Sequence, residues 1–279
     1  MNPMYLANGG LHVTPMRRPR ADVDGEIVLS TDKSVSRSGG VVLRPSGPWS
    51  PAVLALLRHL ESVGFTEAPR VVEPGLSADG REMVTFLEGQ FVHPKAWSDP
   101  AIVEVGRMLR RLHDATATFA PPPGSAWKSW FLRDIGGATP VYGHGDIAPW
   151  NMITKAGMPL ALVDWEYAGP IDPLSELARV CWLFPQLHDD DVGRMQDLPS
   201  PATRARQVRL LVDAYGASAE QRRQLFDRIL EVTVRETAQE AIDADVTLES
   251  AGVLWGLAWR ARAAGWMLRH RDTLEGALR

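Results

Sequence analysis

The stretch Val141-Tyr-Gly-His-Gly-Asp-Ile-Ala-Pro-Trp-Asn-Met-Ile-Thr154, followed by Leu160-Ala-Leu-Val-Asp-Trp-Glu166, carries most of the information in this 279-residue chain. It contains two short β-type runs, Met152 to Lys155 and Leu160 to Val163. Between them lies Ala-Gly-Met-Pro, a turn-rich linker that suits a hairpin. We therefore expect the two runs to pair antiparallel.

The residues just outside this hairpin are chemically informative. If Lys155 faces Leu160, Asn151 and Asp164 become direct neighbours. An amide oxygen and a carboxylate are hard ligands that suit magnesium, which completes its shell with phosphate and water. Asp146 lies five residues before Asn151 in a Gly-containing, Pro-interrupted loop that cannot be helical. Its carboxylate is therefore expected in the same cleft, next to an incoming hydroxyl group.

These residues resemble the aminoglycoside phosphotransferase and choline-kinase-like enzymes, a family related to the protein kinases. His144-Gly-Asp146 with Asn151 is similar to the family's catalytic loop, Asp164-Trp-Glu166 to its metal-binding segment, and Asp172-Pro-Leu-Ser-Glu-Leu-Ala to the motif that follows. The likeness is close over residues 141–178 and looser elsewhere. The segment Arg44-Pro-Ser-Gly-Pro-Trp-Ser-Pro51 also resembles a bacterial subgroup of this family. Members of that subgroup carry generic phosphotransferase names or are likened to a trifolitoxin immunity protein.

The resemblance implies a phosphotransferase that uses ATP, or GTP, with Mg²⁺ and a small-molecule hydroxyl acceptor. Asp146 would be the catalytic base, and Asn151 and Asp164 the magnesium ligands. His144 and Asp172 would support the catalytic loop. Because the transition state of phosphoryl transfer is loose, such a base mainly orients the acceptor and takes its proton late.

The same resemblance implies where the nucleotide binds. Backbone groups near Thr85, Phe86 and Leu87 would contact adenine. The turn from Ser30 to Ser34 would cover the phosphates.

Two residues depart from the family pattern in this lobe. Arg44 stands where the family has a lysine that holds the α- and β-phosphates, and Val53 stands near the expected glutamate of the next helix. Arg44 fits two interpretations equally well, a phosphate ligand or a solvated residue at a strand edge. The usual lysine–glutamate ion pair is therefore not expected.

Hydrophobic patterns divide the chain into an arm at residues 1–25, a small α+β lobe at 26–90 and a mainly helical lobe at 91–279. The expected elements of the small lobe are three strands and one helix, at Glu26–Ser30, Gly40–Arg44, Met83–Leu87 and Ser50–Val63. This organisation predicts a protein-kinase-like, two-lobed α+β fold.

The larger lobe begins with a helix capped by Ser98 or Asp99 that runs to about His113. The catalytic loop, residues 141–178, is followed by a helical acceptor-binding subdomain at 179–279. Its expected helices span 203–215, a segment that begins at Ser218 with a capping box, and a last segment after residue 246.

Three side chains are candidates for acceptor binding. Trp150 lies inside the catalytic loop, so its position brings it near the cleft. Glu166 fits an acceptor contact, a second metal ligand or a structural hydrogen bond. Asp189, in an acidic run, could attract a cationic acceptor, although such a run more often forms a solvated loop or a helix cap.

Two helical patterns in the same subdomain have structural interpretations. Glu236, Glu240, Asp243 and Asp245 are expected on one exposed helical face. A tryptophan set shares another face and is expected to fill the core, at Trp255, Trp259 and Trp266.

Composition narrows the class of protein. Apolar residues form 45% of the chain, and the net charge of −4 gives no basic field for nucleic acid or an anionic membrane. The single cysteine, Cys181, excludes an intramolecular disulfide and suits a reducing compartment. No secretory signal or membrane span is evident, so we expect a cytoplasmic protein; its oligomeric state stays open.

Two other hypotheses compete with phosphoryl transfer. One is an immunity-type protein that keeps the fold and binds a nucleotide or partner with little turnover, which the departures at Arg44 and Val53 motivate. The other is a metal-dependent hydrolase built on Asp146, Asp164 and His144, which lacks the further ligands that such sites show.

Overall fold

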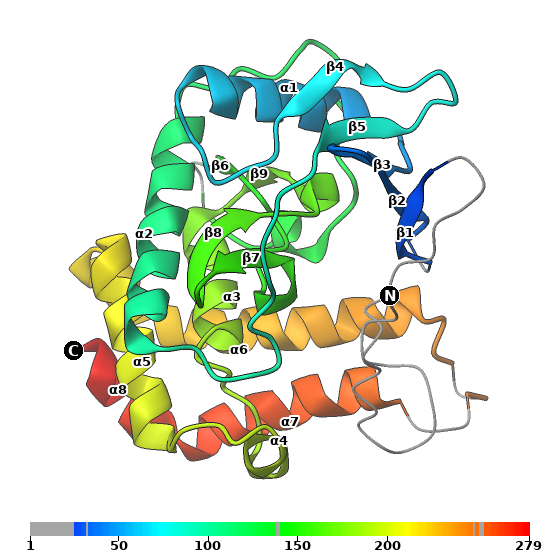
Figure 1. Ribbon diagram of the computed structural model, residues 1–279. Helices are drawn as coiled ribbons and strands as arrows, with labels where there is room; N and C mark the ends of the chain where they lie inside the picture. Colours follow the sequence, from blue (N-terminus) through cyan, green and yellow to red (C-terminus); the bar gives the residue numbers. More distant parts are fainter. Residues whose placement is uncertain (1–24, 32, 138–139, 248, 251–253) are drawn as a thin grey trace.

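The computed structural model describes residues 25–31, 33–137, 140–247, 249–250 and 254–279 (Figure 1). All but the last residue of the arm expected at 1–25 lie outside these ranges. The predicted boundary near residue 90 stays a prediction. At that point, Gln90 exchanges two backbone hydrogen bonds with Thr154, at 2.9 and 2.8 Å.

An antiparallel sheet with the strand order β1-β2-β3-β5-β4 forms the core of the small lobe. Its strands are β1 (Ile27–Ser30), β2 (Val35–Ser38), β3 (Val41–Arg44), β4 (Val71–Leu76) and β5 (Glu82–Thr85). Three of them confirm the expected strands: β1 and β3 each begin one residue later than expected, and β5 spans Glu82–Thr85 rather than Met83–Leu87. β2 and β4 were not predicted, because Val-Ser-Arg-Ser is mostly polar and β4 contains Pro74 and Gly75.

Helix α1 (Ser50–Ser62) covers this sheet and also touches the larger lobe (Figure 1). Its apolar face is buried as the spacing predicts, with Val53, Leu56, Leu57 and Leu60 in the core. Val63 is instead 46% exposed, because the helix ends one residue before it.

The larger lobe is mainly helical. Its helices are α2 (Asp99–Thr116), α3 (Pro173–Leu183), α4 (Asp190–Met195), α5 (Pro201–Tyr215), α6 (Ala219–Asp243), α7 (Trp255–Arg269) and α8 (Arg271–Leu278). The Ser98 cap of α2, the Gly216 stop after α5 and the capping box of α6 all confirm the sequence signals. The single helix expected after residue 246 is in fact two, since the chain breaks at His270.

Two small sheets lie between the lobes in Figure 1 and carry the catalytic loop. One pairs β6 (Val141–Gly143) with β9 (Gly169–Ile171); the other pairs β7 (Met152–Lys155) with β8 (Met158–Leu162). Short 3-10 helices flank them, η1 (Phe131–Asp134), η2 (Pro149–Asn151) and η3 (Trp165–Tyr167).

The predicted register of the β7–β8 hairpin is wrong. Lys155 pairs with Met158 rather than Leu160, because the turn consists of Ala156 and Gly157 alone. Both have positive φ, 52° and 77°, as a tight two-residue hairpin turn requires. An irregularity after Ile153 shifts the pairing back by one residue, so Met152 pairs with Leu162 and the Asn151 carbonyl accepts the Val163 N–H at 2.9 Å, one residue before Asp164.

The core of the larger lobe absorbs the aromatic residues. Trp259 and Trp266 are buried and Trp255 packs partly buried against the core, as expected. No helix within the described ranges combines the length and the apolar character that a bilayer span needs.

Candidate functional site

Glu176 on α3 anchors the backbone of the catalytic loop. One of its carboxylate oxygens accepts the Gly145 N–H at 2.7 Å, and the other lies 2.8 Å from Nε2 of His113. Gly145 has φ of +82°, and a Cβ there would collide with the Tyr167 carbonyl. Glycine is therefore required at this position, and a buried carboxylate holds it from α3.

His144 supports the loop from inside. Its Nε2 lies 3.0 Å from the Val163 carbonyl, and its Nδ1 accepts the Asp146 N–H at 3.1 Å. Complete burial lowers its pKa to about 4, so the imidazole is neutral at pH 7. Both nitrogens are used within the loop, which leaves neither as a metal ligand.

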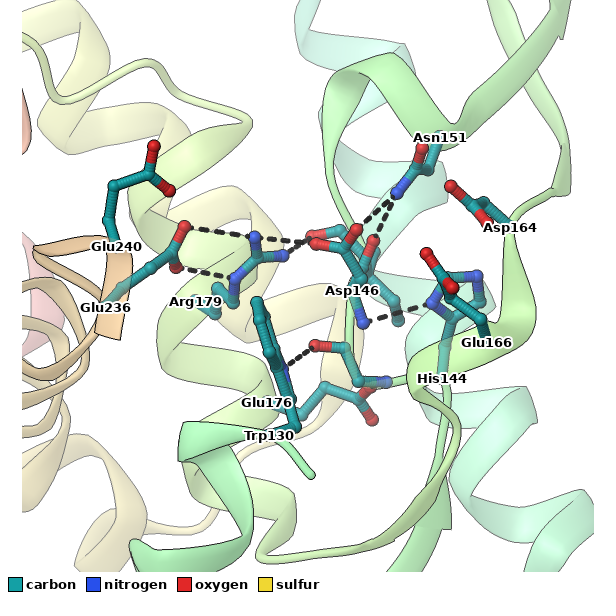
Figure 2. Close-up of polar contacts among 12 residues, drawn as sticks. Trp130, His144, Asp146, Asn151, Asp164, Glu166, Glu176, Arg179, Glu236 and Glu240 are labelled. Carbon is teal, nitrogen blue, oxygen red and sulfur yellow. Dashed lines mark hydrogen bonds and ion pairs between the residues drawn. The ribbon is translucent and has the colours of Figure 1, made fainter. Parts of the chain in front are cut away.

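Asp146 has both carboxylate oxygens engaged (Figure 2). Oδ1 pairs with Nη2 of Arg179 at 2.7 Å, and Oδ2 accepts Nδ2 of Asn151 at 2.8 Å. Nδ2 of Asn151 also donates to the Asp146 carbonyl at 2.9 Å. Burial raises the pKa of Asp146 to about 6, while the Arg179 charge opposes that rise. The carboxylate is thus held in one orientation.

Arg179 belongs to a buried charge network that the sequence reasoning missed. Its Nε donates to Glu236 of α6 at 2.8 Å, and Arg260 of α7 reaches the same carboxylate at 3.4 Å. The expected exposed position of Glu236 is wrong, since the residue is only 3% exposed. Figure 2 shows Arg179 between Asp146 and Glu236. The sequence signal for this network was the presence of charged residues in the otherwise apolar sequence of α3, because a buried charge needs a partner.

Asp164 meets two cations of the small lobe. It adopts a left-handed conformation with φ of 69°. Nζ of Lys33 lies 2.5 Å from its Oδ2, and Nη1 of Arg44 lies 3.9 Å from its Oδ1. Burial would raise the pKa of Asp164, but these two charges outweigh burial and hold the pKa below its ordinary value.

Glu166 lies between two lysines. Its Oε1 is 3.4 Å from Nζ of Lys33, and its Oε2 is 2.6 Å from Nζ of Lys128. The Lys128 ammonium also lies over the rings of Trp49 and Tyr167, 4.9 and 4.4 Å from their centroids. Neither lysine was identified as a site residue from the sequence.

The donor set suits a magnesium ion shared with phosphate. The amide nitrogen of Asn151 is used by Asp146, which leaves its amide oxygen for a cation, and Figure 2 shows Asp164 beside it. No group of three His, Cys, Asp or Glu side chains in the described ranges is arranged to hold a metal. Two protein oxygens, from Asn151 and Asp164, suit a magnesium ion. The hydrolase hypothesis needs His144 as a third ligand, and both nitrogens of His144 are already hydrogen-bonded within the loop.

Arg44 is not at a strand edge. It lies on the central strand β3, and its side chain is 11% exposed. Its Nε lies 2.9 Å from Oε2 of Glu82, the residue opposite it on β5. Ser50 donates to the other Glu82 oxygen at 2.5 Å. The small lobe therefore has a buried ion pair after all, with its glutamate on a strand, while Val53 belongs to the core.

The residues expected at adenine are partly engaged in the sheet. The Thr85 N–H donates to the Arg70 carbonyl and the Phe86 N–H to the Gly40 carbonyl, both at 2.8 Å. The Arg37 guanidinium lies 3.6 Å from the centroid of the Phe86 ring. Within the described part of the chain, the Leu87 N–H donates no hydrogen bond to the backbone.

The remaining predicted residues have local roles. Ser34 forms the turn before β2 with φ of 51°, and Asp172 caps α3 through the Ser175 N–H at 2.9 Å. Trp150 packs edge-on against His93 at 5.5 Å.

Asp189 is not available for a cationic acceptor. It caps α4 and pairs with Arg262 and Arg269 at 2.9 and 2.6 Å. The structure thus favours the helix-cap interpretation of this acidic run.

Comparison with known proteins identifies the family. A model described as the phosphotransferase enzyme family matches residues 127–226. The chain is 52% identical over 247 residues to a trifolitoxin immunity protein of Rhizobium leguminosarum bv. trifolii, covering 88% of this chain and 95% of that protein. The chain belongs to the phosphotransferase enzyme family.

Solved structures similar to this phosphotransferase family member share its fold. An amicoumacin kinase in complex with AMP-PNP, Ca²⁺ and Ami superposes with a TM-score of 0.66 at 11% identity, covering 93% of this chain and 90% of that one. A choline/ethanolamine kinase family protein from Mesorhizobium loti gives 0.52 at 18% identity, covering 88% of each chain. The predicted kinase-like, two-lobed fold is confirmed.

Proposed function

We propose that this chain transfers the γ-phosphate of ATP, or of GTP, to a hydroxyl group of a small molecule. The observation that carries the proposal is the convergence of Asp146, Asn151 and Asp164, with the Asp146 carboxylate held by Arg179 at 2.7 Å. Membership of the phosphotransferase enzyme family supports it.

In this proposal, Asp146 orients the acceptor hydroxyl toward the γ-phosphorus atom. Arg179 and Asn151 hold the carboxylate so that little motion is needed when the acceptor arrives. The hydroxyl oxygen forms the new bond to phosphorus, the bond to the bridging oxygen of the nucleoside diphosphate breaks, and the hydroxyl proton passes late to Asp146. Magnesium held by Asn151 and Asp164 would offset the phosphate charge.

We infer an acceptor of the class that includes aminoglycoside-like antibiotics and small hydroxylated metabolites. The fold similarity alone names no substrate. Trp150 remains the acceptor-contact candidate, because Asp189 is occupied by two arginines and Glu166 by Lys33 and Lys128. The buried Cys181 thiol suits a reducing compartment and supports a cytoplasmic location.

An immunity-type binding function is the second candidate. The 52% identical relative is named as an immunity protein, which favours this alternative. In such a protein the same nucleotide site would bind its ligand with little turnover.

Calorimetry and thermal shift with ATP and GTP, with and without Mg²⁺, test the proposal on the natural chain and on Asp164→Ala. We expect Mg²⁺-dependent stabilisation of the natural chain and its loss in the variant. A screen of hydroxyl acceptors then separates the two functions, because transfer supports the phosphotransferase and tight binding without transfer supports the immunity-type protein. No nucleotide binding by the natural chain would reject both forms of the nucleotide site.

A further inference from the structure

The small lobe provides two cationic side chains to Asp164, Arg44 and Lys33. They differ in how firmly other residues hold them. Arg44 occupies the β3 position expected for a phosphate-binding lysine, but its Nε is bound to Glu82, whose other oxygen is bound to Ser50. The side chain is therefore tied to the interior of the lobe, with Nη1 3.9 Å from Asp164. The main partner of Arg44 is therefore the buried Glu82 carboxylate, and its contact with Asp164 is longer.

Lys33 reaches the same carboxylate from the turn between β1 and β2. Its Nζ lies 2.5 Å from Oδ2 of Asp164 and 3.4 Å from Oε1 of Glu166, although 131 residues separate Lys33 from Asp164. The side chain is 36% exposed, so its flexible stem is not packed into a core. Both of its partners belong to the metal-binding segment.

Two hydrogen bonds hold Lys33 and Ser34 next to the end of β1. The Lys33 N–H donates to Oγ of Ser30 at 3.2 Å, and the Ser34 N–H donates to the Thr31 carbonyl at 3.2 Å. Burial opposes the charge of Lys33, but Asp164 and Glu166 outweigh burial and raise its pKa, so the ammonium group persists at neutral pH.

A magnesium ion held by Asp164 would compete with the Lys33 ammonium for that carboxylate. The Lys33 ammonium would then lose its partner and need another anion. A nucleotide that binds together with the metal would supply that anion through its phosphate oxygens.

We propose that Lys33 is the phosphate-binding lysine of this chain: it pairs with Asp164 when no nucleotide is bound and moves to a phosphate oxygen of the bound nucleotide. The inference rests on the proposed nucleotide site and deepens it. In this assignment, a lysine of the β1–β2 turn binds the phosphates, because Arg44 stands at the β3 position where the family has its phosphate-binding lysine.

Calorimetric titration of Lys33→Met with MgATP and with adenosine, which has no phosphate, tests this assignment. Loss of a charged hydrogen bond predicts about 10- to 100-fold weaker MgATP binding, with adenosine affinity within about twofold of the natural chain. Lys33→Arg keeps the charge and should recover most of the MgATP affinity. Lys155→Met, at an exposed hairpin residue, is the matched control and should bind like the natural chain.

Titration with Mn²⁺ alone tests the pair between Lys33 and Asp164 separately from the contact with phosphate. Removing the competing ammonium should tighten Mn²⁺ binding to Lys33→Met by at least about threefold, opposite in sign to the effect on MgATP.

The outcomes separate this inference from the proposed function. Natural MgATP affinity in Lys33→Met, or equal losses for MgATP and adenosine, would overturn the role of Lys33 and leave the nucleotide site intact. Failure of the natural chain to bind MgATP would overturn both. Weaker MgATP binding together with tighter Mn²⁺ binding would establish the assignment.

Discussion

Asp164 belongs to the catalytic loop and pairs with two cations of the small lobe, yet the two regions assemble their charged groups differently. In the loop, the hydrogen-bond partners of Asp146 are close in sequence, since His144 contacts its backbone and Asn151 its side chain, whereas its ion-pair partner Arg179 comes from α3. In the small lobe, Lys33 meets Asp164 across 131 residues. Local hydrogen bonds therefore leave a recognisable spacing in the sequence, whereas long-range ion pairs do not.

The largest expected effect is in the loop, at the Asp146 carboxylate. Asp146→Asn should lower the rate of phosphate transfer about 10²- to 10⁴-fold, because an amide cannot accept the hydroxyl proton. Steady-state transfer to an acceptor found by screening measures the loss, and calorimetry should show nearly natural MgATP affinity. An unchanged rate would remove Asp146 from the mechanism.

Breaking the network behind the loop should cost the most stability. Arg179→Met leaves two buried carboxylates, Asp146 and Glu236, without their shared cation, and should lower the free energy of unfolding by about 3–5 kcal/mol. Urea denaturation measures it. Arg179→Met/Glu236→Gln should lose less than the sum of the single variants, and strict additivity would show that the network is not coupled.

The matching change in the small lobe should have a smaller effect. Arg44→Met removes the partner of the buried Glu82 carboxylate but leaves the Ser50 hydrogen bond, so we expect a loss of about 2 kcal/mol in urea denaturation. Arg44→Met/Glu82→Gln, which removes the stranded charge, is the control. A loss of unfolding free energy as large as that of Arg179→Met would show that both regions depend equally on their buried ion pair.

Acid should weaken the loop through His144. Its pKa is about 4 in the folded protein and about 6.5 in the unfolded chain, so the unfolded state binds more protons between these values. The stabilising contribution is therefore complete above pH 6.5 and is lost as the pH falls toward 4, by about 2 kcal/mol at pH 5. Asp146, whose pKa is raised to about 6, shifts the stability in the opposite direction over this range, so the His144 contribution is measured as the difference between the natural chain and His144→Gln in urea denaturation at pH 7 and pH 5.

The smallest effect is expected at Asp189. Asp189→Asn keeps a capping oxygen and loses charge pairs with the partly exposed Arg262 and Arg269, so it should change stability by about 1 kcal/mol or less. Its KM for a cationic acceptor should equal that of the natural chain. A large rise in KM would restore Asp189 as an acceptor residue.

The loop was foreseeable because its chemistry depends on short spacings. Asp146, Asn151 and Asp164 were identified from residue order, and the structure brings them together even though the predicted hairpin register was wrong. The error did not separate Asn151 from Asp164, because an irregularity in the hairpin recovers one of the two residues by which the register was off.

By itself, the sequence determined the family likeness, the two-lobed α+β fold, most helix ends and the residues of the catalytic loop, since capping, periodicity and spacing act over a few residues. Only the tertiary structure decided which charges meet. It joined Arg179 to Asp146 and Glu236, Arg44 to Glu82, and Lys33 to Asp164, because an ion pair needs only proximity in space. Burial then forced each charge to find a partner, and the fold, not the residue spacing, chose which one.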